Sequence, residues 1–401
     1  MPHIAERTRQ IKRSPIRKIA ELLARAAGRP TIISFGGGAP GIPPPKELME
    51  KARELVTNWP PYKYTATRGV PSLLSALSDY IKRYTGQEYD PKKEITVTEG
   101  GTEGILLALM ALVDPGDEVI LMNPTYVGYW QPIKLCGGII RDIPVYVEEG
   151  FQPNPERIKE AISERTKLLI LLTPDNPTSR IVKREIAQAI IDLANDHDFW
   201  VLYDDIYGHM VYEGENVWVS GLPGARERVV TVSSFSKMAS IPGLRLGFAY
   251  GPEEVIAAME KVKQYVTLCS STFSQLLAEY FLTTGVLEKY IREVVVPTYK
   301  RQRDAMYEAL TELLPEARTV KAPASFYHFV NVQPYLERLG MNDEEFSERL
   351  FHEKEVVVIP GMYFGSRGEN HIRLTFVSEP PERIREGLKR IAEFLRERGA
   401  L

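Results

Sequence analysis

The chain has 401 residues, of which 44% are apolar and 26% are charged, the proportions of an ordinary globular protein. A chain of this length fits one large domain plus a smaller one better than a single hydrophobic core. The formal net charge of −3 argues against a broad nucleic-acid-binding surface, which needs a strongly basic domain, so we expect no nucleic-acid partner.

The N-terminal segment, residues 1–18, contains six Lys or Arg and one Glu, and it lacks the apolar stretch of a secretory signal. We interpret it as a solvated arm or a first helix. No apolar run approaches the roughly 18 residues of a membrane helix. The two cysteines, Cys136 and Cys269, are too few for a disulfide framework, and the six histidines form no metal-binding pair. We therefore expect a cytoplasmic protein with neither a membrane partner nor a metal.

Two turn-rich stretches, GGGAPGIPPP and NWPPYKYTATRGVP, lie beside helix-like segments at 45–56 and 71–86. From residue 94 onward, short apolar strands alternate with helices. The helices are expected at 102–113 and 183–198, and the strands at 94–101, 118–124, 137–145, 165–174, 199–205, 228–237 and 245–251. This alternation predicts an α/β domain with a largely parallel sheet.

The pattern changes after about residue 285, where an α+β unit is expected. Its elements are a long helix interrupted near Pro297, two alternating strands and two amphipathic helices, at 287–314, 326–332, 371–377, 344–354 and 381–399. We therefore predict a large domain over residues 46–286. Residues 1–45 and 287–401 are predicted to form a small domain with an N-terminal arm.

Polar groups gather where the predicted strands end. Ligands of parallel sheets bind beyond the carboxyl ends of the strands, so this coincidence is the strongest indication of a binding site. The groups are Gly100-Gly101-Thr102, Asn123-Pro124-Thr125-Tyr126, Asn176-Pro177, Asp204 and Lys237.

The stretch SSFSKMASIPGLRLG surrounds Lys237 with hydroxyls and places an arginine close by. Ser234, Ser236 and Arg245 are suited to holding a phosphate dianion. The GGTEG segment opens a helix whose glycine-bared amides form a second phosphate-binding device. A phosphate held from two sides beside a lysine amine indicates pyridoxal phosphate bound as a Schiff base, although a lysine in such a loop can also be a plain surface residue.

Asp204 ends the apolar strand FWVLYDD, where a carboxylate is costly to bury without a partner. Pyridoxal chemistry needs an acid against the ring nitrogen, and Tyr207 could donate to the cofactor's phenolic oxygen. Asp204 could equally cap a helix, a role that Asp205 fits as well. Asn176 is either a binding amide or a turn residue, and Tyr126 is either a ring-stacking aromatic or a core tyrosine.

Taken in order, these segments resemble the class I aminotransferases of the pyridoxal-phosphate fold-type I superfamily, from about Ser14 to the C-terminus. The segments that carry the resemblance are ISFGGGAPG (33–41), YKYTATRGVPSL (62–73), VTEGGTEG (97–104), NPTY (123–126), DNPTS (175–179), YDDIY (203–207), SSFSK (233–237), GLRLGF (243–248) and HIRLTF (371–376). The resemblance implies a large domain with a mostly parallel seven-stranded sheet, a smaller α+β domain and a homodimer with shared active sites.

The resemblance also implies a role for each residue around the cofactor, pyridoxal 5′-phosphate. Lys237 matches the Schiff-base lysine, which also shuttles protons, and Asp204 matches the partner of the ring nitrogen. Asn176 and Tyr207 match the donors to the phenolic oxygen, and Tyr126 matches the residue stacked on the ring. The phosphate-binding residues implied are Gly101, Thr102, Ser234, Ser236, Arg245 and, from the neighbouring subunit, Tyr64.

On the substrate side, Arg373 matches the arginine that binds the α-carboxylate as a bidentate fork, with Asn176 beside it. Gly38 matches a backbone contact to the same carboxylate. Arg17, in SPIRK, matches a more variable residue near the entrance of the active site.

Three positions depart from the family pattern. Ser179 stands where the family's NPTG motif has a glycine, and PAS at 323–325 replaces a glycine-containing stretch before FYHF. Thr102 stands where one aspartate-specific bacterial branch has a lysine that binds the distal carboxylate. The last departure weakens a strict aspartate assignment without excluding it.

The implied reaction is a ping-pong transfer of an amino group from an L-amino acid to a 2-oxo acid, with 2-oxoglutarate as the expected acceptor. Aromatic side chains near the expected site favour aromatic or broad donors; they include Tyr62, Tyr64, Tyr126, Tyr129 and Tyr327. An aspartate-type aminotransferase remains an alternative, as do a β-lyase, a decarboxylase or a cyclopropane-carboxylate synthase on the same scaffold. A pyridoxal-binding transcription regulator is not expected, because only about 30 residues precede the first motif.

Overall fold

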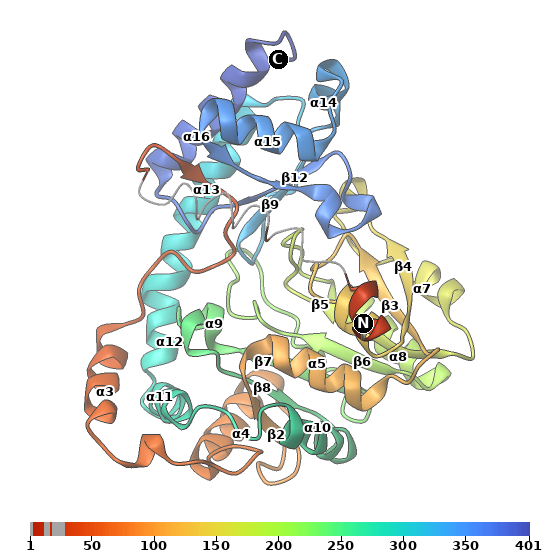
Figure 1. Cartoon of the computed structure of the whole chain (residues 1–401), viewed down its shortest axis with the longest axis vertical. Coiled ribbons are helices and arrows are strands. Elements are labelled where there is room, and N and C mark those ends of the chain that lie inside the picture. Colours follow the sequence, from red (N-terminus) through yellow and green to blue (C-terminus); the bar gives the residue numbers. More distant parts are fainter. Residues whose placement is uncertain (1–2, 12–16, 18–28) are drawn as a thin grey trace.

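The computed structural model describes residues 3–11, 17 and 29–401. Its centre is a seven-stranded sheet with the strand order β2-β8-β7-β6-β5-β3-β4 (Figure 1). The strands are β2 Ile95–Thr98, β3 Glu118–Asn123, β4 Ile139–Pro144, β5 Thr166–Leu172, β6 Trp200–Asp204, β7 Val229–Ser234 and β8 Gly247–Tyr250. Strand β8 runs antiparallel to both of its neighbours, and all other pairs are parallel. The predicted α/β class with a mostly parallel sheet is confirmed.

Helices cover both faces of this sheet, which explains the unbroken apolar sequence of β5. Leu168 and Ile170 pack in one buried cluster with Leu107 of α5, whereas Leu169 packs in a second cluster with Ile190 of α8. The helices of this part of the chain are α3 Lys46–Val56, α4 Pro71–Thr85, α5 Gly100–Leu112, α6 Trp130–Leu135, α7 Pro155–Ala161, α8 Arg184–His197, α9 Phe235–Met238, α10 Glu253–Val266 and α11 Thr272–Thr283.

Two expected boundaries were wrong, both at strand ends. The strand expected over 228–237 stops at Ser234, whose hydroxyl accepts a hydrogen bond from Ser236 N and so begins the short helix α9. Lys237 therefore lies on a helical turn. The helix expected from residue 102 already begins at Gly100, because the chain turns there with a φ of +73° that glycine adopts without strain.

The C-terminal part contains a three-stranded antiparallel sheet, drawn above the central sheet in Figure 1. A second small sheet pairs β1 with β10 in parallel. The strands are β1 Ile33–Ser34, β9 Tyr327–Asn331, β10 Val356–Val357, β11 Ile359–Pro360 and β12 His371–Thr375. The helices outside the central region are α1 Glu6–Gln10, α12 Val286–Tyr290, α13 Val296–Leu313, α14 Gln333–Leu339, α15 Asp343–Lys354 and α16 Pro381–Arg396.

The break expected near Pro297 is a π-helical turn, Ile291–Val295, which joins α12 to α13. Pro297 itself lies in the first turn of α13, where its missing N–H is tolerated. Single 3-10 turns occupy Pro60–Tyr62, Val147–Glu149, Val219–Gly221, Pro242–Leu244, Gly361–Phe364 and Ser366–Gly368. No helix in the described ranges is long and apolar enough to cross a membrane.

A buried ion pair ties α5 to α10 behind the central sheet. The ammonium of Lys263, fully buried, lies 3.2 Å from the Glu103 carboxylate. It also donates to Thr267 Oγ1 at 3.2 Å and to Ser270 Oγ at 3.0 Å. Every donor of this ammonium thus has an acceptor, as a buried cation requires.

Lys263→Met should therefore lower the free energy of unfolding by about 3–5 kcal/mol, because it leaves the Glu103 carboxylate buried without its cation. Urea titration at a fixed protein concentration measures the change. Lys93→Met is the matched control, since Lys93 and its partner Glu253 are both more than half exposed and such pairs contribute less than about 1 kcal/mol. Equal losses in the two variants would contradict the structural role given to Lys263.

Candidate active site

A cavity of about 340 Å³ lies at the carboxyl ends of β5, β6 and β7. Predicted site residues from distant parts of the sequence meet in its wall: Gly38, Gly101, Thr102, Tyr126, Asn176, Asp204, Tyr207, Ser234, Ser236, Lys237, Arg245 and Arg373. Two predicted residues do not line it. Tyr64 is 85% exposed, and Arg17 is also exposed.

One end of the cavity is shaped for an anion. Here the first turn of α5 meets the hydroxyls of Ser234 and Ser236, which lie 2.9 Å apart. A Cβ on Gly100 would lie 2.7 Å from Arg245 Nη2, so the glycine lets the guanidinium approach the helix start. Backbone amides at a helix N-terminus, two hydroxyls and a guanidinium are together the donor set that a phosphate prefers.

Asp204 lies deep in the cavity wall and is 1% exposed. Its carboxylate accepts hydrogen bonds from Tyr129 Oη at 2.6 Å and from Ile206 N at 3.2 Å. Burial raises the pKa of the Asp204 carboxyl to about 6, and these two hydrogen bonds moderate the rise. The sequence predicts Tyr129 only as an aromatic near the site; its spacing of three residues from Tyr126 is the one local signal of a shared site.

A buried charge pair that the local sequence does not predict lies in the loop that follows β5. Asp175 Oδ2 lies 3.2 Å from Arg180 Nη1 and accepts a 2.6 Å bond from the Thr178 hydroxyl. Asp175 is fully buried and Arg180 is 3% exposed. The nearby Asp175 charge also contributes to the raised pKa of Asp204. The pair holds the loop that carries Asn176.

The Lys237 amine donates a short hydrogen bond to Gly38 O, from the loop on the far side of the cavity. Burial, with the nearby charges of Arg373 and Arg245, lowers the pKa of this amine to about 8. A lysine with a pKa in this range is partly neutral near pH 7–8 and can act as a nucleophile or a base.

Arg373 also lines the cavity and is 3% exposed. Its guanidinium donates to Gly36 O at 2.8 Å and to Asn176 Oδ1 at 3.1 Å. Its Nε has no hydrogen-bond partner within the described part of the chain. A buried guanidinium with a spare donor beside an open cavity is suited to binding a carboxylate.

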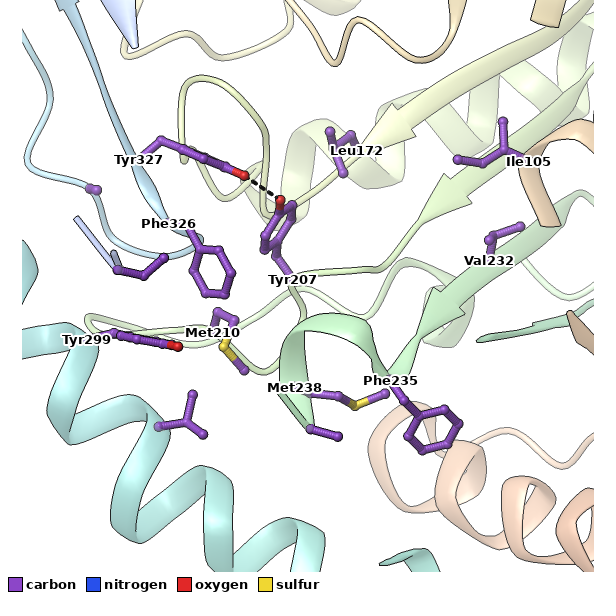
Figure 2. Packing of buried hydrophobic residues seen from close by; sticks show 14 of the residues in the cluster. Ile105, Leu172, Tyr207, Met210, Val232, Phe235, Met238, Tyr299, Phe326 and Tyr327 are labelled. Atoms are coloured by element: carbon purple, nitrogen blue, oxygen red, sulfur yellow. Dashed lines mark hydrogen bonds between the residues drawn. The ribbon is translucent and has the colours of Figure 1, made fainter. Parts of the chain in front are cut away.

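Tyr207 contributes its hydroxyl from the loop after β6. Figure 2 shows this hydroxyl pointing at that of Tyr327 on β9, and the two oxygens lie 2.8 Å apart. A Cβ on Gly38 would lie only 2.6 Å from Tyr327 Oη, so the glycine loop passes close over the tyrosine. The segments 36–38, 204–207 and 327–331 are thereby held around one space.

The raised pKa of Asp204 predicts a pH-dependent stability in the protein freed of small molecules. An aspartate with a pKa of about 3.9 when unfolded and about 6 when folded binds more protons in the folded state between these values. Stability contributed by its neutral form is therefore lost as pH rises from about 4 to 6, by about 3 kcal/mol. Asp204→Asn should thus become more stable relative to the wild type, by this amount, between pH 4 and pH 7.

Urea unfolding at a series of pH values tests this, with Asp198→Asn, at an exposed aspartate, as the control for a change in net charge. A stability difference between Asp204→Asn and the wild type that stays constant from pH 4 to pH 7 would contradict the assignment.

The chain is similar to known proteins over almost its whole length. Residues 30–391 match the family model for aminotransferases of class I and II. The chain is 33% identical to an aspartate aminotransferase of Pyrococcus abyssi, with 98% of this chain and 99% of that one covered. It is 32% identical to aromatic-amino-acid aminotransferase 2 of Thermococcus litoralis, with the same coverage.

Among solved structures, the aspartate aminotransferase of Thermus thermophilus with maleate superposes with a TM-score of 0.91 at 32% identity, over 98% of this chain and all of that one. The structural likeness extends over the central sheet and the C-terminal part alike. The family model, the relatives and the solved structure agree, and the chain belongs to the class I and II aminotransferases.

Proposed function

We propose that this aminotransferase, whose cofactor is pyridoxal 5′-phosphate, moves the amino group of aromatic and other L-amino acids to a 2-oxo acid, with 2-oxoglutarate as the principal acceptor. The observation that carries the proposal is the placement of three groups in one cavity: the Lys237 amine, the Asp204 carboxyl and the Arg373 guanidinium. An amine nucleophile, an acid and a carboxylate receptor are the groups that amino transfer needs.

The residues present fit the cofactor. The first turn of α5, Ser234, Ser236 and Arg245 would hold its phosphate, and Tyr126 would stack on its ring. Lys237 would bond to its aldehyde carbon, and Asp204 would hold a proton on its ring nitrogen. When bound, the cofactor supplies an electrophilic carbon and a ring that accepts electrons from the substrate.

The protein's own groups then do three things. Arg373 binds the substrate's α-carboxylate and so fixes the orientation of the adjacent Cα–H bond. The Lys237 amine is the base that would take the Cα proton and deliver it to the cofactor's aldehyde carbon. Asp204, buried and bonded to Tyr129, would hold the proton on the ring nitrogen.

The cavity wall supports an aromatic or broad donor range. The cationic side chains among the described lining residues are Lys237, Arg245 and Arg373, and each already has a proposed partner. Much of the remaining wall is apolar or aromatic, including Tyr126 and Tyr327. Aspartate remains a second candidate donor, because the relatives from Pyrococcus abyssi and Thermus thermophilus are named aspartate aminotransferases.

A panel of L-amino acids with 2-oxoglutarate tests the proposal. Glutamate should form with phenylalanine or tyrosine as donors at least as fast as with aspartate. Lys237→Ala is the control: it removes the nucleophile, so turnover should fall to near background, and the visible absorbance of lysine-bound cofactor should disappear. Pyruvate or ammonia released without glutamate would instead indicate a β-lyase, and release of CO₂ would indicate a decarboxylase.

We further propose a homodimer in which Tyr64 reaches the phosphate bound by the other subunit. Large hydrophobic side chains are exposed on neighbouring segments: Trp59, Tyr62, Tyr64, Tyr265 and Leu268. A 2.6 Å hydrogen bond from Thr272 Oγ1 to Lys63 O brings the start of α11 against the segment that carries them. Aromatic and apolar surface of this kind is typical of oligomer interfaces.

Leu268→Asp should therefore give monomers in sedimentation velocity and weaken cofactor binding, because a charge buried in the interface is costly and Tyr64 is withdrawn. Leu135→Asp, at a comparably exposed leucine on α6, should remain dimeric. A Leu268→Asp variant that stays dimeric would show that the dimer interface does not include Leu268.

Two further proposals concern organisation and location. The division into residues 46–286 and residues 1–45 with 287–401 is supported by the three-stranded sheet, whose strands all follow residue 326. A cytoplasmic location is supported by Cys136 and Cys269, which are both unpaired.

A further inference from the structure

We propose that Tyr327 is a positioning residue that serves both ends of the active site, and that Ser179 holds it in place. This inference rests on the proposed function. The Tyr327 hydroxyl orients Tyr207 toward the cofactor, and its ring supports Arg373 on the side of the substrate's carboxylate. A single side chain thus couples cofactor binding to substrate binding.

The role of the Tyr327 hydroxyl depends on the number of protons that the two tyrosine hydroxyls can donate. Tyr207 Oη and Tyr327 Oη lie 2.8 Å apart, and the two residues are 5% and 1% exposed (Figure 2). Each hydroxyl has one proton to donate. If Tyr207 gives its proton to the cofactor's phenolic oxygen, Tyr327 has to be the donor between the two tyrosines. Accepting a hydrogen bond from Tyr327 makes the Tyr207 hydroxyl a stronger donor, because consecutive buried hydrogen bonds polarise and strengthen one another.

The ring's part follows from its contact with Arg373. The guanidinium carbon lies 4.3 Å from the centre of the Tyr327 ring and 5.0 Å from that of Phe364. These cation–π contacts fix the guanidinium plane, and the Tyr327 contact needs the ring but not the hydroxyl. The two functions of Tyr327 can therefore be separated by substitution.

Ser179 holds the backbone of Tyr327. Its hydroxyl donates to Tyr327 O at 2.7 Å and accepts from Tyr327 N at 3.2 Å, and the serine is fully buried. The backbone of Ser179 has a φ of +60°, which is unfavourable for a residue with a Cβ. Glycine would adopt this φ freely but has no hydroxyl. The serine is thus unfavourable for the turn and useful for Tyr327.

The experiment uses the holoenzyme and three readouts: the pH midpoint of the absorbance change of bound cofactor, steady-state kcat and KM, and the affinity for the unreactive carboxylates maleate and 3-phenylpropionate. Tyr207→Phe and Arg373→Lys are the reference variants for the two ends of the site. The titratable groups that face Tyr207 are Tyr327, Arg373 and Tyr126.

Tyr327→Phe keeps the ring and removes the proton donor. We expect its pH midpoint to shift in the same direction as in Tyr207→Phe but by less, and kcat to fall about tenfold, the effect of one buried hydrogen bond. KM and carboxylate affinity should stay within about twofold of the wild type. Tyr327→Leu removes the ring as well. It should show the same changes as Tyr327→Phe and, in addition, a higher KM and a weaker carboxylate affinity, as in Arg373→Lys.

The serine is tested by Ser179→Gly and Ser179→Ala. Both lose the hydroxyl, but only the glycine variant relieves the backbone, so it should be the more stable of the two. Both should nevertheless show the midpoint shift and the raised KM, because both release Tyr327. Wild-type values in Ser179→Gly would overturn the part assigned to Ser179.

An unchanged midpoint in Tyr327→Phe would overturn the part assigned to the Tyr327 hydroxyl, even if kcat fell. Unchanged carboxylate affinity in Tyr327→Leu would overturn the part assigned to the ring. If Tyr327→Leu does not fold, Tyr327→Met, which also lacks the ring, takes its place, and unchanged affinity there has the same meaning. Absence of transamination in the wild type would refute the proposed function alone, because the absorbance and affinity measurements need no turnover.

Discussion

Leu172 at the end of β5 pairs with Asp204 at the end of β6, and Asp204 pairs in turn with Val232 of β7. Because these parallel strands run in the same direction and finish close together, the chain that leaves each of them turns at the same edge of the sheet. Residues as distant in sequence as Asn176 and Lys237 therefore line one cavity. The start of α5, which follows β2, and Arg373, which lies on β12 of the three-stranded sheet, complete the wall of the same cavity.

Burial shifts the pKa values of Lys237 and Asp204 in opposite directions. It lowers the pKa of the Lys237 amine and raises that of the Asp204 carboxyl, because each group loses the water that would stabilise its charge. Both shifts bring the pKa values of these groups closer to neutral pH, and a group transfers a proton most effectively when its pKa lies near the working pH. Burial is the largest cause of both shifts, and neighbouring charges add to each: Arg373 and Arg245 for Lys237, and Asp175 for Asp204.

The alternation of strands and helices predicted the central sheet, and the polar residues at strand ends predicted most of the cavity wall. The strand prediction rested on β5 and its neighbours, whose short, continuous apolar runs are typical of strands buried on both faces. Contacts between side chains far apart in the sequence could not be predicted from such local patterns. The bond from Tyr129 to Asp204 and the contact of Tyr327 with Arg373 join segments whose local sequences are ordinary for core tyrosines. The helical turn at Lys237 was missed because it spans only four residues.

The ion pair between Glu103 and Lys263 has a consequence for heat tolerance. It tethers α5, whose first turn faces the cavity, to α10 at its back. The cost of removing ions from water falls as temperature rises, whereas apolar attraction levels off. Warming therefore loosens an apolar contact more readily than this tether. The first turn of α5, which is proposed to bind the phosphate, should therefore keep its position on heating while parts of the molecule held only by apolar contacts become more mobile.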